Sequence, residues 1–398
     1  MKFHASADGT DDALYEIPVL DGFSFSQATN STEVTLNEAA DSSGNSKRGR
    51  AMFNDSFAPA EWSFSTYMRP SVSDSSDTYT IASGEGSHAG NAKKFAVEGP
   101  LWAAMSATTY NLGVGGTGAP TLNTFEPNSF NFQNSNKVAL GVFDLFFVLG
   151  ASKDTDGTYT SGSGGVMIYK LESCSIGSAS IDFDIEGIAQ VAWSGNGKLI
   201  TEQATLNTAA GQASTKGLIN EGISSTTNFI RQKLTDLAIA YDASESTGDT
   251  TGIGSSDITY SLTLTGGNIT IENNLTYLTP ESLGTVNQPL GHVMGTRSVS
   301  GNFTCYLNDV SNGSADLFEN LVESTGLITN AFALTFGIGG SGNTPSVDVA
   351  IPKAHLELPS HSIDDVIGIE VNFHGLSSDL SSATASSSAN EVSITYDA

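Results

Sequence analysis

The feature that most constrains the fold of this chain is an internal repeat, because repeated sequence patterns predict repeated structural units. Five segments of the first half match five segments of the second half, in the same order and with the same spacing of apolar residues. The matching pairs are Gly22–Gln27 with Gly267–Glu272, Phe64–Met68 with Phe303–Leu307, Leu101–Met105 with Leu317–Leu321, Val142–Phe147 with Ala331–Phe336, and Val191–Gly195 with Val371–Gly375. We therefore expect two copies of one domain.

The repeat divides the 398 residues into four parts. We predict an N-terminal arm at 1–13, a first domain at 14–195, a connecting segment at 196–227 and a second domain at 228–398. The connecting segment mixes small and polar residues without a sustained periodicity, which is typical of a connection between domains. A chain of this length has two or three domains of the usual size, so the division is reasonable.

Alternating apolar and polar residues, as in Phe23–Ser26 and Trp62–Ser65, form the pattern of half-buried strands. Only 15% of the residues are charged, whereas globular chains have about 25%. The sequence thus excludes a helical bundle and predicts a mainly β protein. Helix patterns occur at Glu98–Ser106 and Ser314–Ser324, one in each repeat. We expect two tandem β-sandwich or half-barrel domains, each with one flanking α-helix and long loops.

The chain is strongly acidic, with 16 Lys and Arg residues against 43 Asp and Glu residues and a formal net charge of −27. Nucleic-acid binding proteins use clustered cations to displace counterions from phosphates. The acidic composition therefore excludes tight binding of DNA or RNA as the main function.

Other features of the sequence bear on the cellular compartment. No stretch approaches 18 consecutive apolar residues, so we expect no membrane span. No apolar segment follows the first residues, which predicts a protein that stays in a cytosol or leaves by lysis or a dedicated machine. Cys174 and Cys305 are far apart and show no CxxC spacing, so we expect buried thiols rather than a disulfide scaffold or a zinc site.

Motifs of catalysis and cofactor binding are weak. Gly337–Gly342 fits the GxGxxG pattern formally, but a strand pattern follows it where a dinucleotide site needs a helix, so it predicts a hairpin loop. His355, His361 and His374 lack the spacing of helical metal ligands, and no GxSxG motif surrounds a serine. We expect no enzyme activity, no cofactor and no metal site.

The segment Asp182–Glu186 has an acid at every second position. Successive side chains of a strand point to opposite faces, so the three carboxylates would share one face, with Phe183 and Ile185 on the other. Like charges repel one another, and their face must meet water. Two interpretations remain open: a solvated strand or turn, and the acidic lining of a water-filled passage.

Four segments resemble the tail tube proteins, or major tail proteins, of tailed bacteriophages. They are Tyr15–Ala39, Phe53–Pro70, Ile181–Gly195 and Asn228–Arg231. The first is similar to the first strand and loop of that family, and the second to its second inner strand. Most members have one tube domain per chain, whereas the repeat indicates two domains here.

The resemblance implies a structural protein that forms stacked rings, each a closed β-barrel around a lumen. It implies these partners: further copies of the chain, the tape-measure protein, the tail initiator and terminator proteins, a sheath where the tail has one, and genomic DNA that passes through without tight binding. It places the protein in the phage tail of the virion, after assembly in the host cytoplasm. The acidic composition agrees, because a passage that must release DNA should repel phosphates.

Strand alternation combined with the resemblance identifies candidate residues for the lumen. They are Glu61, Ser63, Ser65, Gln190 and Glu370, with Asp182 and Asp184. In the loop Ser31–Ser56, the basic cluster of Lys47, Arg48 and Arg50 is the candidate for contact between stacked rings. A ring of the family normally contains six tube domains, so two domains per chain imply three chains per ring.

Alternatives remain open at this point. The protein could be another β-rich phage component, such as a tail-tip, fibre, adhesin or carbohydrate-binding surface protein, which should expose aromatic platforms. It could be a secreted acidic hydrolase, with acid pairs such as Asp182 and Asp184 as catalytic candidates. For the tube itself, the competing arrangement has six chains per ring with one domain of each turned outward.

Overall fold

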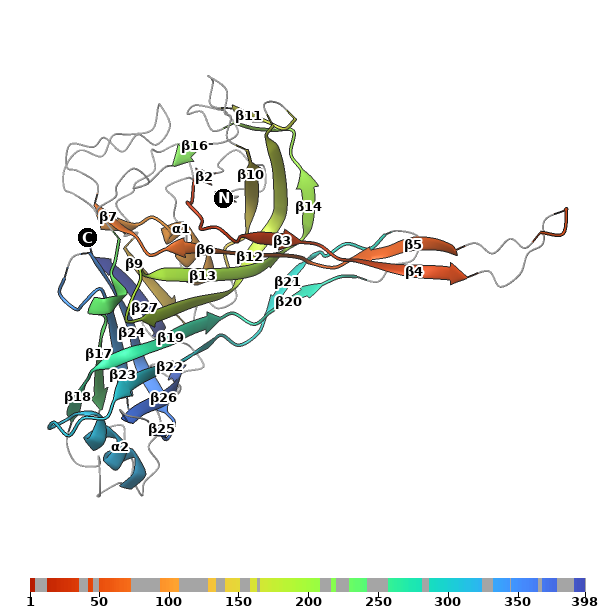
Figure 1. Ribbon diagram of the computed structural model, residues 1–398. Helices are drawn as coiled ribbons and strands as arrows, with labels where there is room; N and C mark the ends of the chain where they lie inside the picture. The colour runs from red at the N-terminus through yellow and green to blue at the C-terminus, as the bar shows by residue number, and fades with distance from the viewer. Residues whose placement is uncertain are drawn as a thin grey trace.

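The computed structural model of the chain describes the residues in seventeen ranges. They are 1–3, 13–35, 42–45, 50–72, 94–106, 128–133, 140–150, 158–162, 165–207, 216–219, 229–241, 257–280, 286–323, 332–343, 345–363, 367–377 and 390–397. Within them the chain forms strands, two α-helices and one short 3-10 helix, which confirms the predicted mainly β class. Figure 1 shows a body of crossing strands from which one long arm extends.

The bounds of the elements follow the chain. In the first half they are β1 (Lys2–Phe3), β2 (Ala13–Tyr15), β3 (Ser24–Ser26), β4 (Thr29–Thr35), β5 (Arg50–Phe57), β6 (Ala60–Tyr67), β7 (Pro70–Val72), β8 (Lys94–Ala96), α1 (Gly99–Ser106), β9 (Ser129–Gln133), β10 (Phe143–Leu149), β11 (Thr158–Thr160), β12 (Met167–Asp184), β13 (Gln190–Gly197), β14 (Leu199–Glu202), β15 (Thr205–Asn207) and β16 (Lys216–Ile219). In the second half they are η3 (Gln232–Leu234), β17 (Asp236–Tyr241), β18 (Ile258–Leu262), β19 (Leu264–Glu272), β20 (Leu275–Leu278), β21 (Gly291–Met294), β22 (Ser298–Tyr306), α2 (Ser314–Glu323), β23 (Phe332–Ile338), β24 (Ser346–Leu356), β25 (Ser360–Ile363), β26 (Ile367–Leu376) and β27 (Asn390–Asp397).

Strands from both halves form one continuous antiparallel sheet, which we call the shared sheet. Its order is β3-β6-β13-β12 in the first half and β19-β22-β26-β25 in the second half. The halves meet where β12 pairs with β19, from Ser178 opposite Glu272 to Asp184 opposite Gly266. Figure 1 shows this succession of strands crossing the body of the molecule.

A second set of strands in each half packs beside the shared sheet. Its order is β2-β1-β10-β12-β14 in the first half and β18-β17-β23-β24-β27 in the second half. β12 takes part in both sets: its first part pairs with β10 and β14, and its last part with β13 and β19. Ser173, between the two parts, has a φ of 51°. β24 likewise pairs with β23 and β27 and then, at its end, with β26.

The strand pairing also shows how the repeated segments correspond in space. Val191 lies opposite Thr66, and Val371 lies opposite Phe303. The sequence comparison matches Phe64 with Phe303, so it differs from the structural correspondence by two residues. Alternation has a period of two, and a shift of two residues leaves every side chain on the same face. The offset therefore does not affect the predicted burial.

Both predicted helices are present. Every residue of α1 is buried, and Gly141 permits its close approach, since a Cβ there would lie 2.9 Å from Cα of Ala104. α2 is amphipathic: it buries Leu317 and exposes Val322. α1 packs against β12 and β9, while α2 packs against β18, so each helix flanks the strands of its own half.

Some strands lie in segments whose sequence shows no strand pattern. Within 196–227, β14 pairs with β12, β15 pairs with β11, and β16 pairs with β2 in parallel. In the predicted N-terminal arm at 1–13, β1 pairs with both β10 and β2. These strands are two to four residues long, which is too short for an alternation to be recognised.

A buried hydrogen-bond network connects the start of α1 to the C-terminal strand. Glu98 accepts hydrogen bonds from the Tyr396 hydroxyl and from the backbone N–H of Arg69, the latter 3.2 Å from Oε2. Trp102 Nε1 donates to Tyr396 Oη at 2.7 Å. β27, which carries Tyr396, pairs with β9 of the first half and β24 of the second. Burial raises the pKa of Glu98 to about 7, against the opposing effect of these hydrogen bonds.

The variant Glu98→Gln should isolate the effect of this carboxyl group on stability. The folded pKa of about 7 exceeds the ordinary 4.5, so the contribution is complete below pH 4.5 and is lost as the pH rises through 7. Relative to the wild type, the free energy of unfolding of Glu98→Gln in urea should increase by roughly 2 to 3 kcal/mol between pH 5 and pH 8. A difference that does not change with pH would contradict a buried, protonatable carboxyl group.

Candidate functional site

The shared sheet has an apolar face and a polar face. Side chains such as Ile181, Trp193 and Phe373 point to one side and are buried. The residues between them form what we call the polar face: Ser24, Ser26, Glu61, Ser63, Ser65, Tyr67, Gln190, Ala192, Ser194, Asn196, Ser178, Ser180, Asp182, Asp184, Asn268, Thr270, Glu272, Ser298, Ser300, Asn302, Thr304, His355, Glu357, Ser360, Glu370, Asn372 and His374. Each of these side chains is exposed or half-buried.

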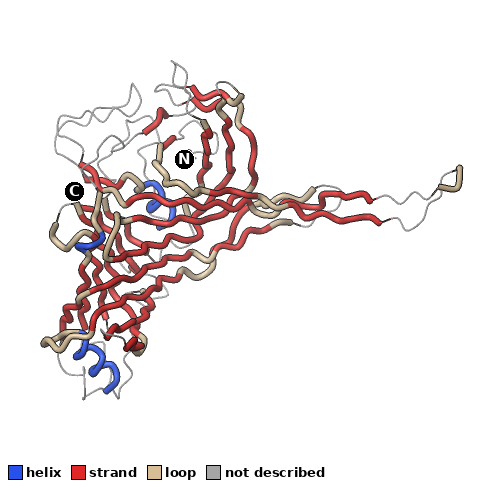
Figure 2. Tube along the Cα trace, in the orientation of Figure 1, coloured by secondary structure: helices blue, strands red, loops and turns tan. Residues whose placement is uncertain are grey.

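All seven residues predicted to line a lumen lie on the polar face. They are Glu61, Ser63, Ser65, Asp182, Asp184, Gln190 and Glu370. The two serines are half-buried and the other five side chains are exposed. The seven come from β6, β12, β13 and β26, so both halves contribute to one surface. Figure 2, in the orientation of Figure 1, shows the strands of the shared sheet crossing the body of the molecule.

Hydrogen bonds between side chains connect neighbouring strands on the polar face. The hydroxyl oxygens of Ser180 and Thr270 are 3.2 Å apart, across the joint between the two halves. In the second half, Asn302 Nδ2 donates to Glu370 Oε1 at 2.8 Å. Cross-strand pairs of this kind stabilise sheets and hold polar side chains in place without requiring charge.

The polar face carries negative charge. Its carboxylates are Glu61, Asp182, Asp184, Glu272, Glu357 and Glu370. Among the described residues, alternation places one cation on the same side: Lys353, two residues before His355 on β24 and half-buried. The exposed His374 has its Nε2 atom 3.2 Å from Glu357 Oε1. Hydrogen bonds from Asn372 and His374 lower the pKa of Glu357, so this group stays ionised. A surface on which carboxylates outnumber cations in this way produces a negative potential in the water above it.

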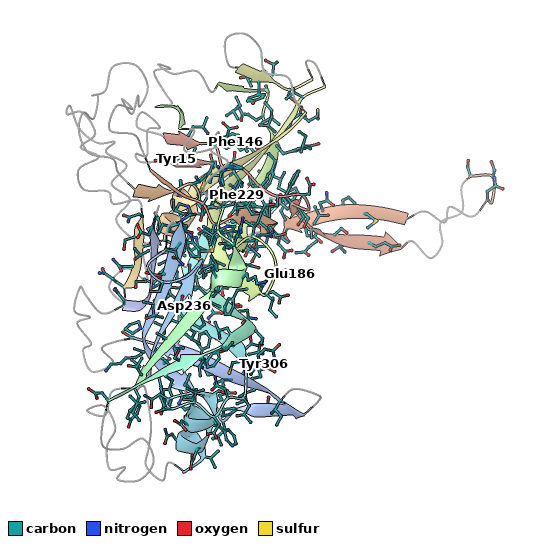
Figure 3. The ribbon with its side chains drawn as sticks, turned by 60° about the vertical axis from the view of Figure 1, so that its left-hand side comes forward. Tyr15, Phe146, Glu186, Phe229, Asp236 and Tyr306 are labelled. Atoms are coloured by element: carbon teal, nitrogen blue, oxygen red, sulfur yellow. The ribbon has the colours of Figure 1, made fainter. Side chains whose placement is uncertain are left out.

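The acidic segment forms a shorter strand than predicted. β12 ends at Asp184, so the alternation expected to place Ile185 on the face of Phe183 stops one residue earlier: Phe183 is 4% exposed and Ile185 is 46% exposed. Gly187 has a φ of 120° in the turn that leads to β13. Glu186 lies in this turn, where Figure 3 labels it, and is exposed. The alternation of apolar and polar residues does not predict the residue at which a strand ends and a turn begins.

Two hairpins leave the shared sheet together and form the arm seen in Figures 1 and 2. β4 pairs with β5, and β20 pairs with β21. Ser56 bridges Asn287 at the base of the arm, where the N–H of Phe57 donates to the Asn287 carbonyl at 2.8 Å. The arm exposes several large apolar side chains: Met52, Phe53, Leu278, Val286, Leu290 and Val293. Such a surface is characteristic of an interaction site.

The predicted basic cluster belongs to the same arm in sequence. The backbone of Arg50 begins β5, but its side chain is not described, and Lys47 and Arg48 lie outside the described residues. The exposed apolar residues of the arm are absent from the sequence-based candidates, because alternation assigns the apolar residues of a strand to a buried face. The one signal was Met52 beside Phe53, two adjacent apolar residues that break the alternation.

The remaining motifs have structural explanations. The GxGxxG-like segment is the hairpin between β23 and β24, as predicted. Cys174 and Cys305 are free and buried, and burial raises the pKa of Cys305 to about 11. In the described part of the chain, no group of three His, Cys, Asp or Glu side chains is placed to hold a metal ion, and the side chain of His361 is outside it. No described helix is long and apolar enough to cross a membrane.

Comparison with known proteins identifies a relative of known function. No family model matches the chain. The chain is 32% identical over 372 residues to the "Tail tube protein pb6" of Escherichia phage T5. The match covers 92% of this chain and 68% of that protein, so it includes residues from both halves and both faces of the shared sheet.

Cysteine labelling tests the two faces of the shared sheet with a matched pair of variants. Ala192 is exposed on the polar face, whereas Ala179 is 1% exposed on the apolar face. In the folded protein, Ala192→Cys should react with a maleimide at least about tenfold faster than Ala179→Cys, because thiol reactivity requires access. The buried Cys174 and Cys305 give a low background in the wild type. Equal rates for the two variants would contradict the assignment of faces.

Proposed function

This chain belongs to the tail tube proteins of tailed phages, and we propose that it polymerises as stacked rings that form the tail tube, a conduit for the tape-measure protein and for ejection of genomic DNA. Its role is structural, and its place is the tail of the virion. The observation that carries the proposal is the shared sheet, in which the two halves lie edge to edge with their polar faces on the same side.

The two ends of the shared sheet support its closure into a ring. Among the described strands, β3 pairs with β6 alone, and β25 pairs with β26 alone. Unpaired strand edges promote uncontrolled aggregation, and a closed barrel removes them. Further copies of the same chain are the partners that would continue the sheet in the order already present within one chain.

We infer that three chains form each ring. The strand orders of the halves correspond element by element, which supports two tandem copies of one domain. Three duplicated chains supply the six domains expected of a ring, with true threefold and approximate sixfold symmetry. An arrangement with one domain turned outward is disfavoured, because both polar faces lie in one sheet. Assembly would occur in the host cytoplasm, with the tail initiator and terminator proteins and a sheath where the tail has one.

The charge of the polar face supports its assignment to the lumen. Six carboxylates against one half-buried lysine, Lys353, among the described side chains would repel the phosphates of DNA. This repulsion prevents tight binding of DNA to the wall of the passage, and a conduit for ejection must not bind DNA tightly. We assign the lumen to the polar face and thus to the seven residues predicted from the sequence, including Glu61, Gln190 and Glu370.

The arm supports contact between stacked rings. Met52 is 66% exposed and Leu290 is 68% exposed, and apolar side chains this accessible favour a protein partner. The arm extends away from the shared sheet, so it can reach beyond the ring to which its own chain belongs (Figure 1). We propose that it contacts the next ring, with the basic cluster at Lys47, Arg48 and Arg50 facing acidic residues there.

Negative-stain microscopy of the purified protein tests the proposed function. We expect rings or hollow tubes, formed alone or on addition of the tail initiator complex. Salt should be varied, because repulsion between chains of charge −27 is screened at high ionic strength. A monodisperse monomer at every salt and protein concentration, with and without the initiator, would contradict the proposal.

Charge reversal on the arm tests the contact between rings. The double variant Arg48→Glu and Arg50→Glu should fold with an unchanged melting temperature, because the described side chains of β4 and β5 do not belong to the core. Its rings should form but stack poorly, so sedimentation should recover fewer and shorter tubes than for the wild type. An unchanged yield and length of tubes would exclude this role for the basic cluster.

A further inference from the structure

The joint within the chain shows how one half fits against the other. Ile181 of β12 lies opposite Ile269 of β19. Two residues further along β12, the ring of Phe183 packs against that of Phe336 in the second half, with the ring centroids 5.5 Å apart. Ile181 is 1% exposed and Phe183 is 4% exposed. The apolar residues at the edge of the first half are thus buried in the core of the second half.

The far edge of the second half is built in the same way. The pair formed by Ala179 and Trp193 corresponds to the pair formed by Leu356 and Phe373. Likewise, Asp182 opposite Gln190 corresponds to Ser360 opposite Glu370. Glu357 N–H donates to the Asn372 carbonyl, which places Glu357 where Ser180 lies in the first half. One additional residue separates Leu356 from Ser360, which forms a bulge. Leu358 lies in this bulge and is 67% exposed.

At the opposite end of the shared sheet, β3 occupies the position that β19 has in the second half. Ser24 lies opposite Ser63, as Thr270 lies opposite Ser300. An apolar pocket of about 300 Å³ adjoins β3, and its lining includes Ile17, Val19, Phe23, Phe64, Leu145 and Phe147. Figure 3 labels Tyr15 and Phe146, two further lining residues, in the same region of the molecule.

The pocket corresponds to a region that is filled in the second half. Phe147 lines it and stacks on Phe23 at 5.6 Å, and Phe147 matches Phe336 in the internal repeat. In the second half, Phe336 is covered by Phe183 from the preceding half. In the first half the corresponding region is the apolar pocket, and Val19 and Phe23 beside it are 40% and 38% exposed.

We propose that the edge of the second half pairs with β3 of the next copy in the register of the internal joint, with Glu357 opposite Ser24 and Leu358 packed into the apolar pocket beside β3. The inference rests on the proposed ring and adds the register and the apolar contact between chains. A second copy is the occupant because it offers Leu358, the exposed apolar residue at the corresponding edge. The bulge makes this joint different from the internal one, so the two kinds of joint alternate around a threefold ring.

Disulfide crosslinking tests the register. The variant Ser24→Cys with Glu357→Cys, oxidised after assembly, should give covalent dimers and trimers on a non-reducing gel. Ser180→Cys with Thr270→Cys is the matched control: the native oxygens are 3.2 Å apart, so it should crosslink within one chain. Ser24→Cys with Ser360→Cys, displaced along the edge, should crosslink much less. Rings that form but crosslink better through Ser360 would overturn the register and leave the proposed function standing, whereas a wild type that forms no ring removes both.

A second variant tests the apolar contact. Leu358→Asp should abolish ring formation while its melting temperature stays close to that of the wild type, because the side chain is exposed in the isolated chain. Val322→Asp, at a side chain 53% exposed on α2, is the matched control and should form rings. If Leu358→Asp assembles as well as Val322→Asp, the contact is wrong. Loss of rings by Leu358→Asp alone supports it even if the cysteine variants assemble poorly.

Discussion

Strand edges must be covered, and the pairing of β12 with β19 is the interaction on which the rest of this structure depends. β12 is 18 residues long and belongs to two sets of strands. Its first part completes the side of the first half, and its last part supplies the edge that the second half covers. One continuous strand therefore contributes both to the core of the first half and to the joint between the halves. Damage to β12 should affect both, since neither is independent of it.

The two faces of the shared sheet explain the unusual composition. A single layer with a buried face and a wet face needs an apolar residue at every second position and a polar one between. Hydroxyl and amide side chains make up most of the polar face and form hydrogen bonds across the strands, as between Ser180 and Thr270. Few charges are then needed, and most of those present are carboxylates. The low charged fraction is a consequence of this surface, which holds six of the 43 acidic residues.

Much of the fold and most of the candidate site follow from alternation. It placed Glu61 and Gln190 on the polar face because each lies between two apolar residues, and burial of those residues leaves no other orientation. Both helices were likewise recognisable from their start patterns. Alternation does not report strand ends, so Ile185 was misplaced, and it has no information about strands of two to four residues such as β14. The apolar surface of the arm, with Met52 and Leu290, was missed because burial depends on partners that the pattern does not specify.

The central claim is that the two halves are successive members of one ring that copies of the chain complete. A cryo-EM reconstruction of the assembled tube, resolved to individual strands, tests it most directly. The account predicts three chains per ring, with threefold symmetry that is close to sixfold, and the polar face with Asp182 and Glu370 on the lumen. Six equivalent chains around one ring, or a lumen lined by lysine and arginine, would contradict it.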